Sequence, residues 1–335
     1  MSRTLLTKLG INLPDFPVTS VGSFPKPPYL KKARDDYAAR RIDQEILEQE
    51  EERATRFWIE WQDEAGLDVL VDGEMYRGDM VTFFAETMRG FEIGGLIRSN
   101  GNRYYHKPII TRPVEWVQPI TVEWFRYAQS LTKKPVKGML TGPYTVMDWS
   151  FNEHYESRRE TTLSLAKEIR KEVEALVEAG CRIIQIDEPA ISVRPDEIPL
   201  AIEAMQICTE GLSAYFISHV CVGSFDKIYP QLLELPVHNL DLELSNPDMD
   251  ILPLLEANAP DKKDISCGLV DVHSREVESL EVVEERMTRA LKTIPADRMW
   301  VDPDCGLKTR TVEEAQAKLE VVVAAARARR ESPAE

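Results

Sequence analysis

His219 and Cys221 stand two residues apart in the segment AYFISHVC, residues 214–221. Alternate residues of a β-strand point to the same face, so both side chains can reach one metal ion if this segment is a strand. Imidazole and thiolate groups are preferred ligands of zinc. The pair therefore predicts half of a metal site.

Two further candidate ligands follow other apolar segments. Glu243 lies near the end of NLDLELS, residues 239–245, and Cys305 ends RMWVDPDC, residues 298–305. Together with the first pair they form a set of one imidazole, two thiols and one carboxylate, which suits tetrahedral Zn²⁺. The other cysteines have no such neighbours and are interpreted as small core residues. They are Cys181, Cys208 and Cys267.

Eight short apolar segments, each bounded by turn residues, predict the elements that must position these side chains. They are residues 18–24, 67–74, 136–142, 181–188, 214–221, 239–245, 265–273 and 298–305. Segments with helical spacing of apolar residues separate most of them, for example 161–180 and 279–294. This alternation predicts an α/β fold, a (β/α)8 TIM barrel, with a doubly wound open sheet as the alternative. Residues 91–121, rich in Gly, Asn and β-formers, predict a β-hairpin insertion.

In a parallel barrel the active-site groups lie at the C-terminal ends of the strands. A polar or metal-binding residue follows nearly every predicted strand, which a purely structural barrel would seldom show. These residues are Ser23, Glu74, Thr141, Asp187, His219, Cys221, Glu243, His273 and Cys305. Asp187 and Glu188 are adjacent and therefore point to opposite faces, so Asp187 is predicted to face the site and Glu188 to be structural.

Composition narrows the class of protein. With 335 residues, 43% of them hydrophobic, the chain can bury a large core, and one catalytic domain over residues 1–335 with a frayed tail at 327–335 is expected. A net charge of −16 argues against nucleic acid as a partner. No segment approaches the roughly 20 apolar residues of a membrane span, and no secretory signal is evident. Five scattered cysteines indicate a reducing compartment, so a cytoplasmic location is expected.

Several longer motifs resemble those of a known family. HVC, LDLELS and VDPDCGLKTR are similar to the zinc motifs in the C-terminal catalytic barrel of cobalamin-independent methionine synthase. VGSFPKP, DVLVDGEMYRGDMVTFF, LTGPYTVMDWSF, QIDEPA and GLVDVHS continue the resemblance in order from residue 18 to about 310.

The resemblance implies a methyltransferase of methionine biosynthesis that transfers a methyl group to homocysteine. It implies that His219, Cys221, Glu243 and Cys305 bind one Zn²⁺. Homocysteine would be bound by Val21, Gly22 and Ser23, and its amino group by Glu74 and Asp187. His273 would be the catalytic proton donor, and Trp149 would lie against the methyl donor.

Two departures from the family concern that donor. The chain is expected to begin directly at the catalytic barrel, without the N-terminal barrel that helps to bind polyglutamylated folate. The family's arginine–cysteine pair that contacts the pterin resembles Arg103 and Tyr104 here. Both departures favour methylcobalamin or a methylated corrinoid protein as donor, with 5-methyltetrahydrofolate as the alternative. Cobalamin would then be a substrate and not a tightly bound cofactor.

Other classes of protein remain open. A related zinc thiol alkyltransferase acting on coenzyme M would need a cationic group for the sulfonate, whereas Glu74 and Asp187 suit an ammonium group. A uroporphyrinogen decarboxylase-like enzyme shares the barrel but does not require the His and Cys ligands. A zinc-stabilised binding or storage protein would have four closed ligands that never exchange with a thiol.

Overall fold

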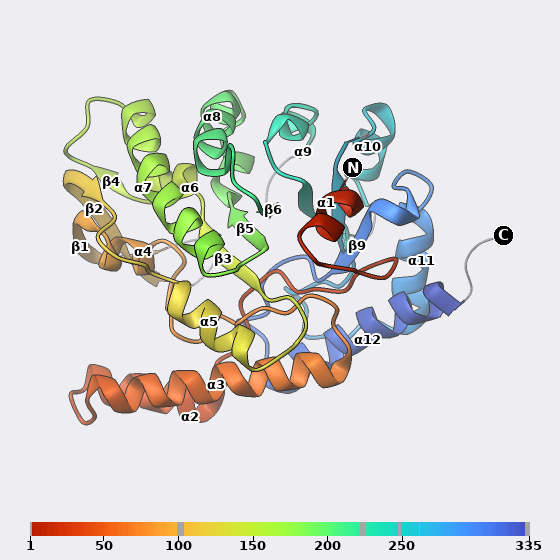
Figure 1. Cartoon of the computed structure of the whole chain (residues 1–335), viewed down its shortest axis with the longest axis horizontal. Coiled ribbons are helices and arrows are strands. Elements are labelled where there is room, and N and C mark those ends of the chain that lie inside the picture. Colours follow the sequence, from red (N-terminus) through yellow and green to blue (C-terminus); the bar gives the residue numbers. More distant parts are fainter. Residues whose placement is uncertain (1, 99–103, 222–224, 247–248, 261, 332–335) are drawn as a thin grey trace. The chain divides into compact units, whose positions relative to one another are not determined.

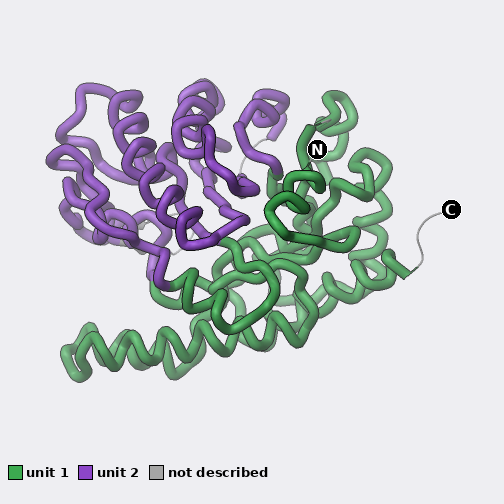
Figure 2. Tube along the Cα trace, in the orientation of Figure 1, with its two compact units in different colours: residues 1–76, 124–137, 239–335 green, residues 77–123, 138–238 purple. Residues whose placement is uncertain are grey.

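The computed structural model describes residues 2–98, 104–221, 225–246, 249–260 and 262–331. The chain divides into two compact units, shown in different colours in Figure 2. Unit 1 comprises Met1–Tyr76, Trp124–Lys137 and Asn239–Glu335, and unit 2 comprises Arg77–Glu123 and Gly138–His238. Each unit is described separately, and the prediction of one domain stays a prediction.

Unit 2 contains parallel strands in the order β3 (Lys137–Thr141), β5 (Ile183–Asp187) and β6 (Tyr215–Val220), as Figure 1 shows. All three are buried along their whole length, as expected for apolar segments of a parallel sheet. Helix α7 (Arg158–Glu178) begins after Ser157, whose side chain accepts a hydrogen bond from Glu160 N and so caps the first turn. The other α-helices among the described residues of this unit are α4 (Thr82–Thr87), α6 (Pro143–Asp148), α8 (Ile198–Thr209) and α9 (Phe225–Ile228).

The β-hairpin is an antiparallel pair within unit 2. Strand β1 (Arg89–Arg98) pairs with β2 (Tyr104–Glu115), and the short strand β4 (Phe151–Asn152) adds to β2 in parallel. The hairpin predicted near residues 91–121 is therefore present, but its second strand ends at Glu115. Helix α5 (Val122–Ser130) follows it.

Unit 1 contains the parallel strands β7 (Asn239–Glu243), β8 (Asp264–Gly268) and β9 (Met299–Asp302). Two predicted strands, 18–24 and 67–74, appear here only as isolated bridges, Val18 with Val301 and Leu70 with Val136. Thr19 N still donates to Val301 O at 3.1 Å, but farther along the first segment Phe24 N donates to Gly73 O in a turn at 3.0 Å. Both segments therefore continue the sheet for a residue or two and then become loops.

Helices cover the rest of unit 1. They are α1 (Ser2–Lys8), α2 (Pro28–Ala38), α3 (Gln44–Ala65), α10 (Leu252–Ala257), α11 (Leu280–Ala290) and α12 (Val312–Glu331). Asp43 caps the start of α3, and Gly66 ends it in the left-handed region with φ 97°. Helix α12 is helical to Glu331, and Arg330 donates to Asp15 O and Phe16 O, both at 2.7 Å; residues 332–335 of the tail predicted at 327–335 lie outside the described residues.

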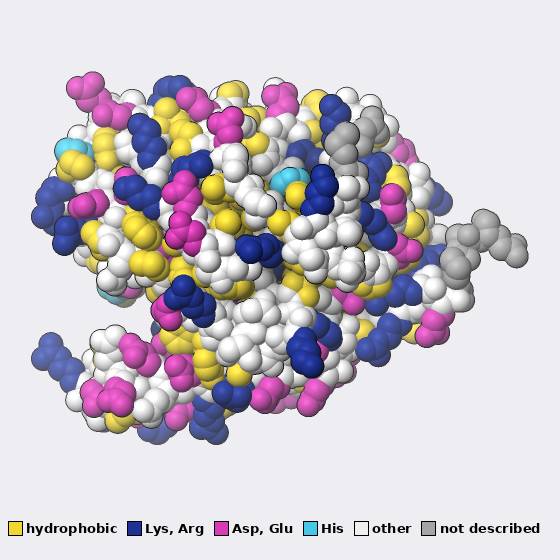
Figure 3. Space-filling model, viewed as in Figure 1, with side chains coloured by type: hydrophobic (Ala, Val, Ile, Leu, Met, Phe, Trp, Pro, Cys, Tyr) yellow, Lys and Arg dark blue, Asp and Glu magenta, His cyan; other side chains and the backbone are white. Residues whose placement is uncertain are grey.

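The predicted α/β fold with a parallel sheet is confirmed. None of the described helices is long and apolar enough to cross a bilayer. On the face shown in Figure 3, acidic and basic side chains are interspersed.

Candidate metal and substrate site

His219 and Cys221 lie at the end of β6 in unit 2. Both are buried, and their ligand atoms lie within 4.8 Å of each other, as the two-residue spacing predicts for neighbours on one strand face. Their backbone carbonyls are fixed by neighbouring residues: Glu188 N donates to His219 O at 3.1 Å, and Ser192 Oγ donates to Cys221 O at 3.1 Å. The strand end is therefore held in place by residues that follow β5.

Asp187 is the last residue of β5, Glu188 follows it, and the two side chains have different hydrogen-bond partners. Gln185 Nε2 donates to Asp187 Oδ1 at 2.8 Å, which orients this buried carboxylate. Glu188 is fully buried and accepts hydrogen bonds from Tyr144 N at 3.0 Å and Thr145 N at 2.8 Å, the first turn of α6. Burial raises the pKa of Glu188 to about 7, against the lowering effect of these donors. Glu188 is thus a structural cap of a helix.

Trp149 follows α6 directly and is half-buried. The residue before it, Asp148, accepts hydrogen bonds from Arg158 Nη2 at 2.7 Å and from Arg194 Nε at 2.6 Å. Arg158 also pairs with Glu197 at 2.6 Å. A charged network therefore fixes the end of α6 where the predicted donor-binding tryptophan stands.

In unit 1, Asp304 joins the two loops that carry Glu243 and Cys305. Its Oδ1 accepts hydrogen bonds from Leu244 N and Ser245 N, both at 3.0 Å, and its Oδ2 accepts one from Ser245 Oγ. Burial raises the pKa of Asp304 to about 7, hydrogen bonds from Ser245 lower it, and the charge of Glu243 raises it further. The carboxyl group of Asp304 therefore connects the segments that carry two predicted metal ligands, Glu243 and Cys305.

The backbone of Asp304 also bonds to the loop after β8, since its N–H donates to Val270 O at 3.1 Å. This close approach requires a glycine at the end of β8. A Cβ on Gly268 would lie 2.5 Å from Asp304 Oδ1 and 2.6 Å from its Cα.

The predicted homocysteine loop, Val21–Ser23, lies against the residue that follows Cys305. Leu307 N donates to Ser23 O at 2.7 Å, and a Cβ on Gly306 would lie 2.0 Å from Ser23 Oγ. Glycine at 306 therefore allows this close contact as well as the tight turn. The structure brings a predicted substrate loop and a predicted metal ligand together within one unit.

Glu74 has φ 60°, in the left-handed region that is uncommon for residues other than glycine. Its N–H donates to Asp72 Oδ1 at 2.9 Å, and Lys26 Nζ donates to its carbonyl at 3.2 Å. Arg34 Nη2 donates to the next carbonyl, Met75 O, at 2.8 Å. Such a conformation persists only where its surroundings enforce it, and it often marks a functional position.

His273 lies in the loop after β8 and is exposed. Its N–H donates to Asp271 Oδ1 at 2.7 Å, and Ser274 N donates to the same atom at 3.3 Å. The aspartate thus forms an Asx turn that shapes the loop around His273. Thr141, the remaining polar strand-end residue, donates from Oγ1 to Met80 O at 2.7 Å.

The cysteines predicted as core residues are buried, and none of the five cysteines forms a disulfide. Burial raises the pKa values of Cys208 and Cys267, which keeps both as thiols. Arg103 and the side chain of Tyr104, where the sequence departs from the family, lie outside the part of the chain that the structure describes.

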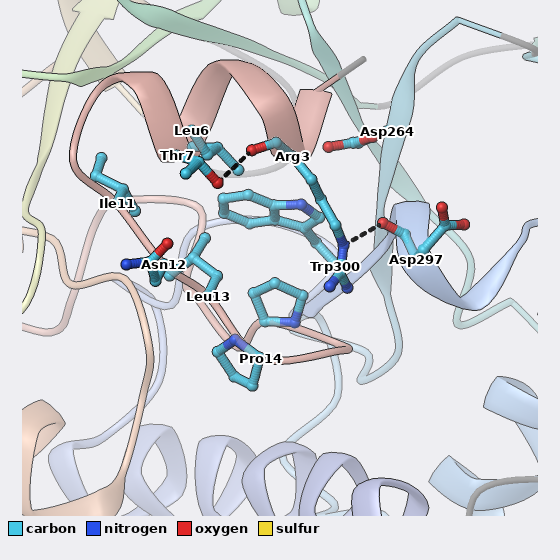
Figure 4. A pocket seen from close by; sticks show the side chains of 11 residues that line it. Arg3, Leu6, Thr7, Ile11, Asn12, Leu13, Pro14, Asp264, Asp297 and Trp300 are labelled. Atoms are coloured by element: carbon cyan, nitrogen blue, oxygen red, sulfur yellow. Dashed lines mark hydrogen bonds between the residues drawn. The ribbon is translucent and has the colours of Figure 1, made fainter.

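Unit 1 also has a cavity of about 210 Å³, which lies apart from the predicted site residues. It lies beneath α1, where Trp300 packs near Leu6 and Pro14 while Arg3 Nε donates to Asp297 O at 3.0 Å (Figure 4). The predicted site residues do not line it. The cavity therefore gives no support to the predicted metal or substrate residues.

Sequence reasoning missed the residues that position the site. Asp304 stands beside Cys305 in the DPDC motif, so its place next to a ligand was a visible signal. Lys26 lies in the VGSFPKP motif just before α2, and Arg34 lies within α2, but only their hydrogen bonds to the backbone around Glu74 reveal their positioning role.

The donor set fits zinc. A buried imidazole and thiol lie within reach of one ion at the end of β6, and Cys305, which is in no disulfide, follows Asp304, whose carboxylate bonds to the residue after Glu243. Zinc accepts sulfur, nitrogen and carboxylate ligands together. The metal itself stays a prediction.

Residues 16–328 match the family described as "Cobalamin-independent synthase, Catalytic domain". The chain is 40% identical over 336 residues to the 5-methyltetrahydropteroyltriglutamate–homocysteine methyltransferase of Aeromonas salmonicida, covering 96% of this chain but 44% of that protein. It is 36% identical to the methionine synthase of Saccharolobus solfataricus, covering 92% of both. The structure of a B12-independent methionine synthase from Shewanella sp. W3-18-1 matches with a TM-score of 0.85 and 26% identity, over 95% of this chain and 99% of that one.

These likenesses correct one expectation. Methylcobalamin or a corrinoid protein as methyl donor is not supported, because the family is described as cobalamin-independent and the Aeromonas relative is named for a methylated pteroyltriglutamate. The enzyme class, a methyltransferase of the methionine synthase type, is confirmed at the level of the family. The chain belongs to the family of cobalamin-independent methionine synthase catalytic domains.

Proposed function

We propose that this chain is a zinc-dependent homocysteine methyltransferase that forms methionine with a 5-methyltetrahydropteroyl compound as methyl donor. The observation that carries the proposal is the loop at residues 304–307. Within unit 1 it holds Cys305, bonds to the loop of Glu243 through Asp304, and contacts Ser23 of the predicted substrate loop.

His219, Cys221, Glu243 and Cys305 would bind the metal. The free thiol of homocysteine has a pKa of about 8.5 and is mostly protonated at neutral pH. Zinc bound by these residues would supply the missing chemistry by favouring the thiolate form of homocysteine.

The remaining residues orient homocysteine. Val21, Gly22 and Ser23 would bind the amino-acid end, and Glu74 with Asp187 would bind its ammonium group. Glu74 and Asp187 are buried, at 8% and 6% exposure. A hydrogen bond to Asp72 holds the backbone of Glu74, and one from Gln185 holds the side chain of Asp187. Charge-assisted hydrogen bonds in such surroundings are strong and directional, which favours one orientation of the substrate.

Methyl transfer forms a carbon–sulfur bond and breaks the carbon–nitrogen bond at N5 of the donor. The electron pair of the broken bond stays on N5, which must take up a proton because a neutral amine is a better leaving group than its anion. His273, exposed in its loop, is the proposed proton donor. Trp149 would lie against the pterin ring, where its half-buried indole offers a stacking surface.

A methyl-transfer assay with homocysteine tests the proposal, comparing 5-methyltetrahydropteroyltriglutamate with methylcobalamin. We expect methionine from the folate donor. Methionine from methylcobalamin alone would refute the proposed donor, and no methionine from either would refute the enzyme activity.

The metal ligands are tested with a matched pair of cysteine variants. Cys305→Ser should remove zinc and activity together, because a hydroxyl is a poor substitute for a thiolate ligand. Cys181→Ser changes a buried cysteine outside the predicted set and should retain zinc. Full zinc content in Cys305→Ser would show that this residue is not a ligand.

A further inference from the structure

A buried lysine from α12 holds the loop that follows β8 in unit 1. Lys318, with a side chain 0% exposed, donates from Nζ to Glu278 Oε2 at 2.9 Å and to Glu276 O. Arg286 on α11 contacts the same carboxylate at 3.4 Å and donates to Leu269 O at 2.6 Å. Two cations that share Glu278 therefore hold both ends of this loop.

The shared carboxylate continues the network to the backbone of His273. Glu278 Oε1 accepts a hydrogen bond from Asp271 N at 2.6 Å. Asp271 Oδ1 in turn accepts hydrogen bonds from His273 N at 2.7 Å and Ser274 N at 3.3 Å. An unbroken series of hydrogen bonds thus leads from Lys318 to the residue proposed as proton donor.

The position of Lys318 is a core position. It lies on the buried face of α12 with Ala315, Leu319 and Val322, at helical spacings of three and four residues. Replacing both members of a buried ion pair with apolar residues often leaves stability unchanged or higher, whereas removing only one member lowers it. The charge is therefore better explained by the loop that it holds than by the stability that it adds.

We infer that Lys318 and Glu278 are positioning residues for methyl transfer, because they fix the loop in which His273 meets the methyl donor. The inference rests on the proposed function, and it assigns to the pair a role in the chemical step. Neither residue touches substrate in this role. A general acid must stand within hydrogen-bonding distance of the atom it protonates, so a loosened loop lowers the rate while leaving homocysteine binding intact.

The test compares Lys318→Met with Arg330→Met. Arg330 lies on the same helix and pairs with Asp68 at 2.6 Å, away from the loop of His273. Both variants remove one ion pair of α12, so an effect of helix docking alone would appear in both. Zinc content, KM for homocysteine, kcat and the amide exchange of residues 269–278 are measured for each.

We expect Lys318→Met to lower kcat roughly ten-fold or more, since small displacements of a catalytic group cost one to two orders of magnitude. Zinc content and KM for homocysteine should stay as in the unchanged protein. Amide exchange should accelerate in residues 269–278 of this variant, whereas Arg330→Met should leave both kcat and this exchange unchanged. If Lys318→Met does not fold, Lys318→Gln replaces it.

A double-mutant cycle with His273→Ala separates positioning from a general structural effect. If the pair acts through His273, adding Lys318→Met to His273→Ala should change kcat less than about two-fold. An equal loss in both backgrounds, or unchanged exchange in residues 269–278, would overturn the inference. Full kcat in His273→Ala would remove both the proton-donor role and the inference, while absence of methionine from the unchanged protein would refute the proposed function itself.

Discussion

Removal of the Asp304 carboxyl group should weaken zinc binding without touching a ligand. Asp304 is 5% exposed and accepts hydrogen bonds from Leu244 N, Ser245 N and Ser245 Oγ. Asp304→Ala leaves two backbone N–H groups without this acceptor and frees the loop of Glu243 from that of Cys305.

The expected magnitude follows from these bonds. A buried donor left without its acceptor costs about 1–3 kcal/mol, so two such groups predict a loss of about 2–4 kcal/mol in the free energy of unfolding of the metal-free protein after partial rescue by water. Loss of a residue that orients metal ligands typically weakens metal binding about 10- to 100-fold. Zinc affinity should fall by that factor in Asp304→Ala.

Asp304→Asn is the matched control. Its side-chain oxygen can still accept from Leu244 N and Ser245 N, and its amide can donate to Ser245 Oγ in place of the bond that Oδ2 accepted. Competition with a chromogenic chelator measures the zinc affinity, and urea denaturation measures the stability. Unchanged zinc affinity in Asp304→Ala, or an equal loss in both variants, would refute the reasoning.

Further predictions concern other contacts. Gly306→Ala puts a Cβ 2.0 Å from Ser23 Oγ, so the hydroxyl of Ser23 must rotate away. Loss of one hydrogen bond from this hydroxyl, about 1 kcal/mol, should raise KM for homocysteine about five-fold. An unchanged KM would contradict the role of Ser23. Glu188→Ala removes the fully buried cap of α6 and should lower the free energy of unfolding by about 3 kcal/mol in urea denaturation, and a smaller loss than 1 kcal/mol would argue against it. Burial raises the pKa of Glu51 from 4.5 to about 7 against the lowering effect of Arg34, so the folded state holds a proton that the unfolded state loses. Stability should therefore fall as pH rises from about 4.5 to 7, and Glu51→Gln should remove most of this fall; equal pH profiles of urea denaturation would refute it.

Local patterns in the sequence predict the strand ends well. The buried strands β5, β6, β7, β8 and β9 correspond to apolar segments of the sequence, and the predicted site residues lie at or just after their C-terminal ends. The segments 18–24 and 67–74 have the same pattern but form single bridges. Beyond these bridges, Phe24 N donates to Gly73 O, which joins the two segments to each other, and Leu307 N donates to Ser23 O. These partners are far apart in the sequence, so no local pattern predicts them.

The supporting side chains could not be predicted in the same way. Asp304 and Leu244 are separated by 60 residues, and Lys318 and Glu278 by 40. Polar residues that bond to the backbone of a residue far away in the sequence show no periodicity. A lysine on the apolar face of a helix only interrupts the apolar pattern, and the sequence does not show which residue it pairs with. Glu188 is the exception, because its neighbour Asp187 already showed which of the two must point away from the strand face.

Unit 1 is assembled from segments at both ends of the sequence, and this has a consequence for biosynthesis. Strand β9 and α12 supply partners for residues 17–19 and 68, since Val301 N donates to Pro17 O and Arg330 pairs with Asp68. These bonds join residues about 260 to 285 positions apart, so the early segments cannot form them until the last helix has left the ribosome. Unit 2 ends at His238 and can collapse earlier in translation. In pulse-labelled ribosome-bound chains, residues 77–123 and 138–238 should therefore become protected from protease before residues 1–76.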